Sequence, residues 1–102
     1  MQNNEYLSAQ PEETVDGARR FAVRLRRIRL GLHTKQVGLS GAIGCSDAAV
    51  SLWESGARIP TPHSMVRLLA ALAEEGTPTS ELLELRGVWL NEYTRRRAAR
   101  RG

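Results

Sequence analysis

Apolar residues recur every three or four positions along most of the chain after Val15, which is the spacing of one face of an α-helix. The first stripe of this kind predicts a helix from about Asp16 to Leu32. It contains Ala18, Phe21, Ala22, Leu25, Ile28 and Leu32. No segment shows a convincing period-two alternation of the kind found in half-buried strands. The pattern therefore predicts an all-α protein.

Turn residues divide the rest of the chain into four further helices. We predict them at residues 36–43, 47–54 and 63–75, and from about residue 80 to residue 94. Glycine and proline mark the breaks between them. His33 follows the first helix at a chain reversal where we expect a left-handed residue, a conformation that histidine tolerates. Five short helices around one core make a compact bundle.

The composition suggests three parts within a chain that is long enough for one domain. Residues 1–15 are polar, with three acids and no base, so we expect a flexible N-terminal arm. Residues 16–94 form the predicted folded domain. Residues 95–102 contain five arginines, and we expect the last helix to fray into a flexible basic tail there.

The distribution of basic residues is compatible with an anionic partner. The formal net charge is +4, and residues 19–35 carry seven bases without an acid. Two basic blocks favour an anionic partner on one face. Only one of the fifteen basic residues is a lysine, and arginine suits nucleic acid because it grips phosphate with two hydrogen bonds and stacks on bases. A solvated surface with a disordered tail explains the same charges, so charge alone leaves both interpretations open.

The most informative segment is residues 36–53, QVGLSGAIGCSDAAVSLW, because it has the features of a helix-turn-helix. Ser40 is small where two helices must cross, and Gly44 supplies the positive φ of a tight turn. Apolar residues face the core from both helices: Leu39, Ile43, Cys45, Val50 and Trp53. We expect Cys45 to be buried and unreactive. Short side chains lie on the outward face of the second helix and suit contact with base edges: Asp47, Ala48, Ser51 and Leu52.

This pattern resembles the phage-repressor-like (Xre/Cro-type) helix-turn-helix family over about residues 18–75. Four elements occur in the family's order and spacing: a first-helix signature at residues 25–29, a glutamine at residue 36, a Gly-Cys-Ser turn at residues 44–46, and the ending V-S-L-W-E-S-G…P at residues 50–60. The chain departs from the family in having serine at position 40, glycine at positions 38 and 41, His-Thr-Lys before the glutamine, and Asp-Ala-Ala at residues 47–49. That last triplet lacks the Arg, Asn or Gln of a strong base reader.

The resemblance implies a DNA-binding transcriptional regulator, expected to be a repressor that binds double-stranded DNA as a symmetric homodimer. Its helix-turn-helix would occupy about residues 36–54, with the recognition helix at about residues 46–54 in the major groove. The implied base contacts are Asp47, Ala48, Ser51 and Leu52, and the implied phosphate contacts are Lys35, Gln36, Ser46 and Arg58. The implied structural residues are Arg29, Glu54, Gly44 and Trp53, and the family pairs the positions of Arg29 and Glu54 in a partly buried salt bridge.

Several of these residues have a second interpretation. Gln36 is also compatible with an ordinary surface position, and Ser46 is a good N-cap for the recognition helix in either case. Asp47 either accepts a hydrogen bond from cytosine or is an acid favoured by the dipole at a helix start. Three residues of the last helix either complete the core or form a dimer or partner surface: Leu85, Trp89 and Tyr93.

The sequence gives no support for an enzyme. It contains no motif for a catalytic, metal or cofactor site, and His33 and His63 lack partners at metal-ligand spacing. It shows no signal peptide or membrane span, so we expect a cytoplasmic protein, associated with the nucleoid when bound to DNA. Two rival functions stay open: a protein-interaction module (an antitoxin or adaptor) on the same fold, and a non-specific DNA binder driven by the arginine tail.

Overall fold

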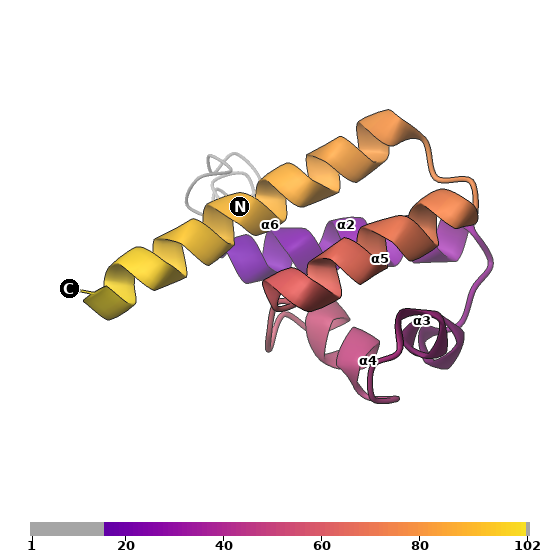
Figure 1. Ribbon diagram of the computed structural model, residues 1–102, viewed down its shortest axis with the longest axis horizontal. Helices are drawn as coiled ribbons and strands as arrows, with labels where there is room; N and C mark the ends of the chain where they lie inside the picture. The colour runs from indigo at the N-terminus through magenta and orange to yellow at the C-terminus, as the bar shows by residue number, and fades with distance from the viewer. Residues whose placement is uncertain (1–15, 102) are drawn as a thin grey trace, which may run out of the picture.

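The computed structural model describes residues 16–101, without the side chain of Arg101, and the predicted N-terminal arm lies outside them. Five helices and no strand are present within this range (Figure 1). They are α2 (Gly17–Gly31), α3 (Gln36–Ile43), α4 (Ala49–Glu54), α5 (Pro62–Glu74) and α6 (Thr79–Arg101). The predicted all-α bundle is confirmed, and the bounds of α3 agree with the prediction.

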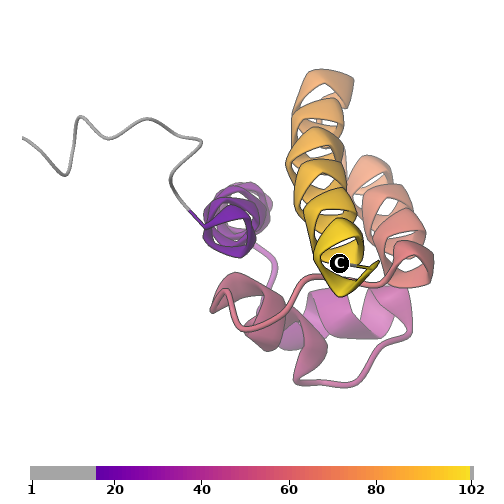
Figure 2. The same cartoon turned by 90° about the vertical axis from the view of Figure 1, so that its left-hand side faces the viewer.

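The helices form two levels. Helices α2, α5 and α6 make the upper level in Figure 1, and the short helices α3 and α4 lie beneath them. Figure 2 shows the same arrangement from the side, with α2 and α5 on opposite sides of the bundle. Helix α2 packs against α6 and α4, while α5 packs against α3 and α6. This arrangement supports α3 and α4 from above and leaves their far side open.

None of the helices in residues 16–101 is both long enough and apolar enough to cross a membrane.

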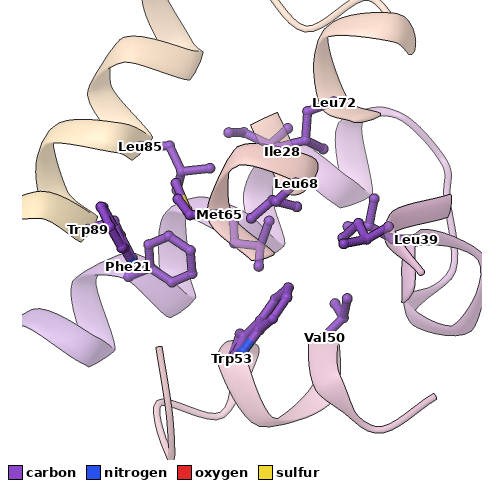
Figure 3. Packing of buried hydrophobic residues seen from close by; sticks show 12 residues of the cluster. Phe21, Ile28, Leu39, Val50, Trp53, Met65, Leu68, Leu72, Leu85 and Trp89 are labelled. Atoms are coloured by element: carbon purple, nitrogen blue, oxygen red, sulfur yellow. The ribbon is translucent and has the colours of Figure 1, made fainter. Parts of the chain in front are cut away.

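Side chains from every helix meet in one core (Figure 3). Phe21 and Leu25 of α2, Leu68 of α5 and Leu85 of α6 are fully buried. Trp53 also lies in this core, as the sequence predicted. Cys45 is only half-buried, which corrects the expectation that it is enclosed. The core joins the open face of α3 and α4 to the upper level of the bundle.

The last helix contributes two of its residues, Leu85 and Trp89, to this core. Leu85 is completely buried and Trp89 is 8% exposed, so neither can form an exposed dimer or partner surface in the folded chain. The indole Nε1 of Trp89 donates a 2.8 Å hydrogen bond to the carbonyl of Pro60. Tyr93 stacks on Trp89 with ring centroids 4.9 Å apart and is packed partly against the core. Leu85 and Trp89 therefore complete the core, which is one of the two interpretations that the sequence left open, and they do not form an exposed dimer or partner surface.

Two residues take the left-handed backbone conformation at the reversals around α3. His33 has φ of 58° between α2 and α3, and Gly44 has φ of 82° at the end of α3. Both agree with the prediction. The N–H of Gly44 donates to the carbonyl of Ser40, and that of Cys45 donates to the same oxygen, which closes the end of the helix.

The two glycines at the end of α3 should respond to alanine with opposite signs. Gly44→Ala places a side chain in the left-handed region and is expected to lower the free energy of unfolding by about 1–2 kcal/mol. Gly41→Ala adds a methyl group in the helix, with no neighbouring atom within 4 Å, and should raise the free energy of unfolding by up to about 1 kcal/mol. Urea denaturation of both variants measures the difference. A loss of stability in Gly41→Ala would contradict the assignment of open space around that position.

Helix α6 continues to Arg101, so the expectation that it frays after about residue 94 is wrong. Glu92 explains the continuation, because its side chain is 2% exposed and lies one turn before the arginines. Its carboxylate accepts hydrogen bonds from Arg95 at 2.7 and 3.0 Å and from Arg96 at 2.6 Å. Charge pairs at these i+3 and i+4 spacings stabilise a helix. Arg97 adds a hydrogen bond to the hydroxyl of Tyr93.

This carboxylate should make the protein sensitive to acid. The hydrogen bond from Arg95 lowers the pKa of Glu92 from its ordinary value of 4.5, and the bond from Arg96 adds to the effect. A lowered pKa in the folded state stabilises the fold above the ordinary value, and that stability is lost as the pH falls through the folded-state value. We expect the melting temperature to fall below pH 4.5, and to fall less steeply in Glu92→Gln. Melting curves between pH 7 and pH 3 test this, with Glu74→Gln, at an exposed position, as the control. An equal acid response in wild type and Glu92→Gln would contradict the prediction.

Candidate nucleic-acid interface

Four exposed side chains lie on the outward side of α4 and of the turn before it. They are the predicted base contacts, Asp47, Ala48, Ser51 and Leu52. Val50 and Trp53, three residues apart on the helix, point the other way and are buried in the core (Figure 3). The helix is therefore held by its inner face, while short side chains cover its outer face.

The start of α4 differs from the prediction. The helix begins at Ala49 with Ala48 as its N-cap, and the side chain of Ala48 forms no capping hydrogen bond. The predicted N-cap Ser46 contributes only its carbonyl, which accepts from the N–H of Ala49. Asp47 therefore lies in the turn that precedes α4, which argues against its alternative role as an acid of the first helical turn.

A serine on the neighbouring helix replaces the missing cap. The hydroxyl of Ser40 is fully buried where α3 crosses α4, as its small size predicted. It accepts a 3.4 Å hydrogen bond from the N–H of Val50 and donates a 3.4 Å bond to the carbonyl of Asp47. One side chain of α3 thus supplies a partner for an otherwise unpaired N–H at the start of α4.

A buried ion pair joins α2 to the end of α4. Arg29 donates from Nε to Glu54 at 2.6 Å and from Nη2 to the other carboxylate oxygen at 2.9 Å. Its Nη1 donates to the carbonyl of Thr34 at 2.8 Å, in the connection between α2 and α3. The pKa of Arg29 is raised, first by the hydrogen bond to Glu54. This is the salt bridge implied by the family resemblance.

Gln36 extends this network to the start of α3. The side chain of Gln36 is half-buried, and its Nε2 donates a 3.0 Å hydrogen bond to Glu54. This bond connects the start of α3 to the end of α4. Its neighbour Lys35 is the N-cap of α3, and within the described chain no side chain caps that helix. The N–H groups of the first turn of α3 are consequently free to bind an anion, as helix N-termini do.

The remaining predicted phosphate contacts, Ser46 and Arg58, are both exposed. Ser46 lies before α4, and Arg58 lies in the loop after it. The sites predicted for bases and for phosphates thus lie on α3, α4 and their flanking turns.

Sequence reasoning missed a further cation at this surface. The guanidinium of Arg67 on α5 lies so close to the turn after α3 that a Cβ built on Gly44 would be 3.1 Å from its Nη2. The same side chain contacts His63, with 3.5 Å between nitrogen atoms. No local sequence pattern predicts that Arg67 lies beside this turn, because its place depends on the packing of α5 across α3.

A comparison with protein families agrees with this geometry. A helix-turn-helix family model matches residues 25–77, just over half of the chain, and the match includes α3, α4 and α5 in full. No curated protein and no solved structure matches the chain.

Proposed function

Because this chain belongs to the phage-repressor-like (Xre/Cro-type) helix-turn-helix family of DNA-binding regulators, we propose that it is a repressor that recognises a specific operator in the major groove as a homodimer. One observation carries the proposal. Asp47, Ala48, Ser51 and Leu52 are exposed together on an element whose opposite face is fixed in the core. A helix held in this way can present its outer side chains to base edges.

The chemistry of these side chains predicts which base atoms they contact. The methyl group of Ala48 and the side chain of Leu52 suit the methyl group of thymine. Ser51 can bond several base edges, and Asp47 can accept a hydrogen bond from the N4 amino group of cytosine. Selectivity then depends on apolar contacts and on exclusion of wrong bases, because a bidentate arginine or asparagine is missing at these four positions.

Phosphate contacts would fix the protein on the duplex. We assign these contacts to Lys35, Gln36, Ser46 and Arg58, which flank the outward face of α4. Gln36 would both bind phosphate and brace α4. Its side-chain amide nitrogen donates a hydrogen bond to Glu54, while its backbone N–H lies in the uncapped first turn of α3, where it can bind a phosphate. Contacts of this kind set register and orientation without selecting a sequence.

A dimer would compensate for the short recognition element. Helix α4 has six residues, so one copy reaches few base pairs, and two copies would read half-sites about 34 Å apart. The contact between the copies has to use surface other than Leu85 and Trp89, which belong to the core. Sedimentation equilibrium with and without operator DNA measures the stoichiometry.

The proposed function is tested by selection from randomised duplexes at about 150 mM salt, followed by sequencing and fluorescence anisotropy. We expect a palindromic motif that binds at least about a thousandfold more tightly than the unselected pool. Weak binding without a motif would reject sequence-specific recognition. A motif without palindromic symmetry, bound by one copy, would reject the dimer alone.

A further inference from the structure

Four arginines from two distant parts of the chain line one open groove. Arg58 comes from the loop after α4, and Arg96, Arg97 and Arg100 come from the last turns of α6. The groove has a volume of about 380 Å³, and residues 59–62 and Tyr93 form the rest of its wall. We call these four arginines and this wall the arginine groove.

The charge of the groove is largely uncompensated. One of the four arginines, Arg96, is paired with the buried carboxylate of Glu92, which also accepts from Arg95 outside the groove. Arg97 is bonded to the uncharged hydroxyl of Tyr93. Within residues 16–101, Arg58 and Arg100 form no ion pair. Several arginines gathered in this way attract a polyanion.

The groove is held in place relative to α4. Trp89 of α6 donates its indole hydrogen bond to Pro60, two residues after Arg58. The pairs of Glu92 with Arg95 and Arg96 keep the end of α6 helical rather than frayed. In Figure 1 this end of α6 projects beyond the other helices, on the side of the bundle where the loop after α4 lies.

We propose that the arginine groove binds the phosphate backbone of the same DNA duplex, outside the base pairs that α4 contacts. The inference rests on the proposed function. Charge complementarity supports it, because four arginines line one open groove, only Arg96 of them is paired with a carboxylate among the described residues, and arginine binds phosphate with two hydrogen bonds. Continuity supports it as well, because Arg58 lines this groove and is also one of the proposed phosphate contacts beside α4.

The test compares two duplexes that carry the selected motif. One duplex ends at the motif, and the other extends it by about ten base pairs, one helical turn, on each side. Anisotropy titrations between 50 and 200 mM salt are made with wild type, Arg100→Gln and the matched control Arg86→Gln. Arg100 and Arg86 are both exposed on α6, but Arg86 lies outside the groove. Arg97→Gln is a second variant within the groove.

On the extended duplex we expect Arg100→Gln to reduce the log–log salt slope by about 0.9 for each protomer bound. Between 50 and 200 mM salt, wild type should therefore lose about threefold more affinity than the variant for each phosphate contact that the variant lacks. Arg86→Gln should leave the slope unchanged, and the short duplex should not distinguish the variants. Equal slopes for Arg100→Gln, Arg97→Gln and wild type on the extended duplex would overturn the inference while leaving operator recognition intact.

Failure of the proposed function would be seen in the selection experiment and not in the salt slopes. If selection recovers no motif, sequence-specific recognition is rejected, and the same variants are compared on an unselected duplex of the extended length. A reduced slope in Arg100→Gln alone then supports phosphate binding by the groove, and equal slopes for Arg100→Gln and Arg86→Gln reject it.

Discussion

Replacing Arg29 by methionine should lower the melting temperature by roughly 15 °C or more. The side chains of Arg29 and Glu54 are 10% and 2% exposed, and two hydrogen bonds join them. Methionine fills part of the space but leaves the carboxylate of Glu54 buried without its cation. Loss of one partner from a buried pair costs about 3–5 kcal/mol, and each kcal/mol shifts the melting temperature of a domain of this size by about 4–8 °C.

The chain contains a matched control for this prediction. Arg24 and Glu84 also form a salt bridge between helices, with 3.1 Å between the two atoms, but their side chains are 35% and 63% exposed. Arg24→Met should therefore change stability by less than about 1 kcal/mol. The double variant Arg29→Met, Glu54→Met should lose less stability than Arg29→Met alone, because no unpaired charge is left buried. An unchanged melting temperature in Arg29→Met, together with weaker DNA binding, would make Arg29 a DNA ligand instead of a structural residue.

Replacing Ser51 by glutamate should weaken operator binding by roughly a hundredfold. Ser51 is exposed on the outward face of α4, so the substitution removes the proposed base contact and adds a negative charge where we propose that base edges and phosphates lie. A wrong contact at one base pair costs about 1–3 kcal/mol, and repulsion from the DNA charge adds to that loss. Because the side chain is outside the core, the melting temperature should stay within about 4 °C of wild type.

Ser80→Glu is the control for charge alone. Ser80 is exposed in the first turn of α6, and the change in net charge is the same as in Ser51→Glu. Operator affinity should fall much less in Ser80→Glu, since the new charge is far from α4 in the bundle (Figure 2). Equal losses in the two variants would mean that binding responds to net charge and that α4 does not read bases.

The helices and the core could be predicted because their signals are local. The stripe that begins at Ala18 predicted α2, and the glycine at position 44 predicted the left-handed turn after α3. The pair Arg29 and Glu54 followed from the family resemblance, although the two residues are far apart in the sequence.

The features that were missed depend on contacts between helices. Ser46 has the right chemistry for an N-cap, but the buried hydroxyl of Ser40 on α3 takes over that role and α4 begins later. Arg67 reaches the turn at Gly44 only because α5 packs across α3. The continuation of α6 had a visible signal, since Glu92 precedes Arg95 and Arg96 by three and four residues. Its burial, which makes those pairs effective, was not visible in the sequence.

The hydrogen bond between Trp89 and Pro60 also makes the fluorescence of Trp89 a probe of the loop after α4. The chain has two tryptophans: Trp53 lies behind the outward face of α4, and Trp89 holds the loop after α4 against α6. Both indoles are almost fully enclosed, so each emits from an apolar setting that water replaces when its own part of the bundle opens. With Trp53 replaced by phenylalanine, the remaining fluorescence follows the loop and the end of α6. With Trp89 replaced instead, it follows α4, so the two sides of the molecule can be watched separately without attaching a dye.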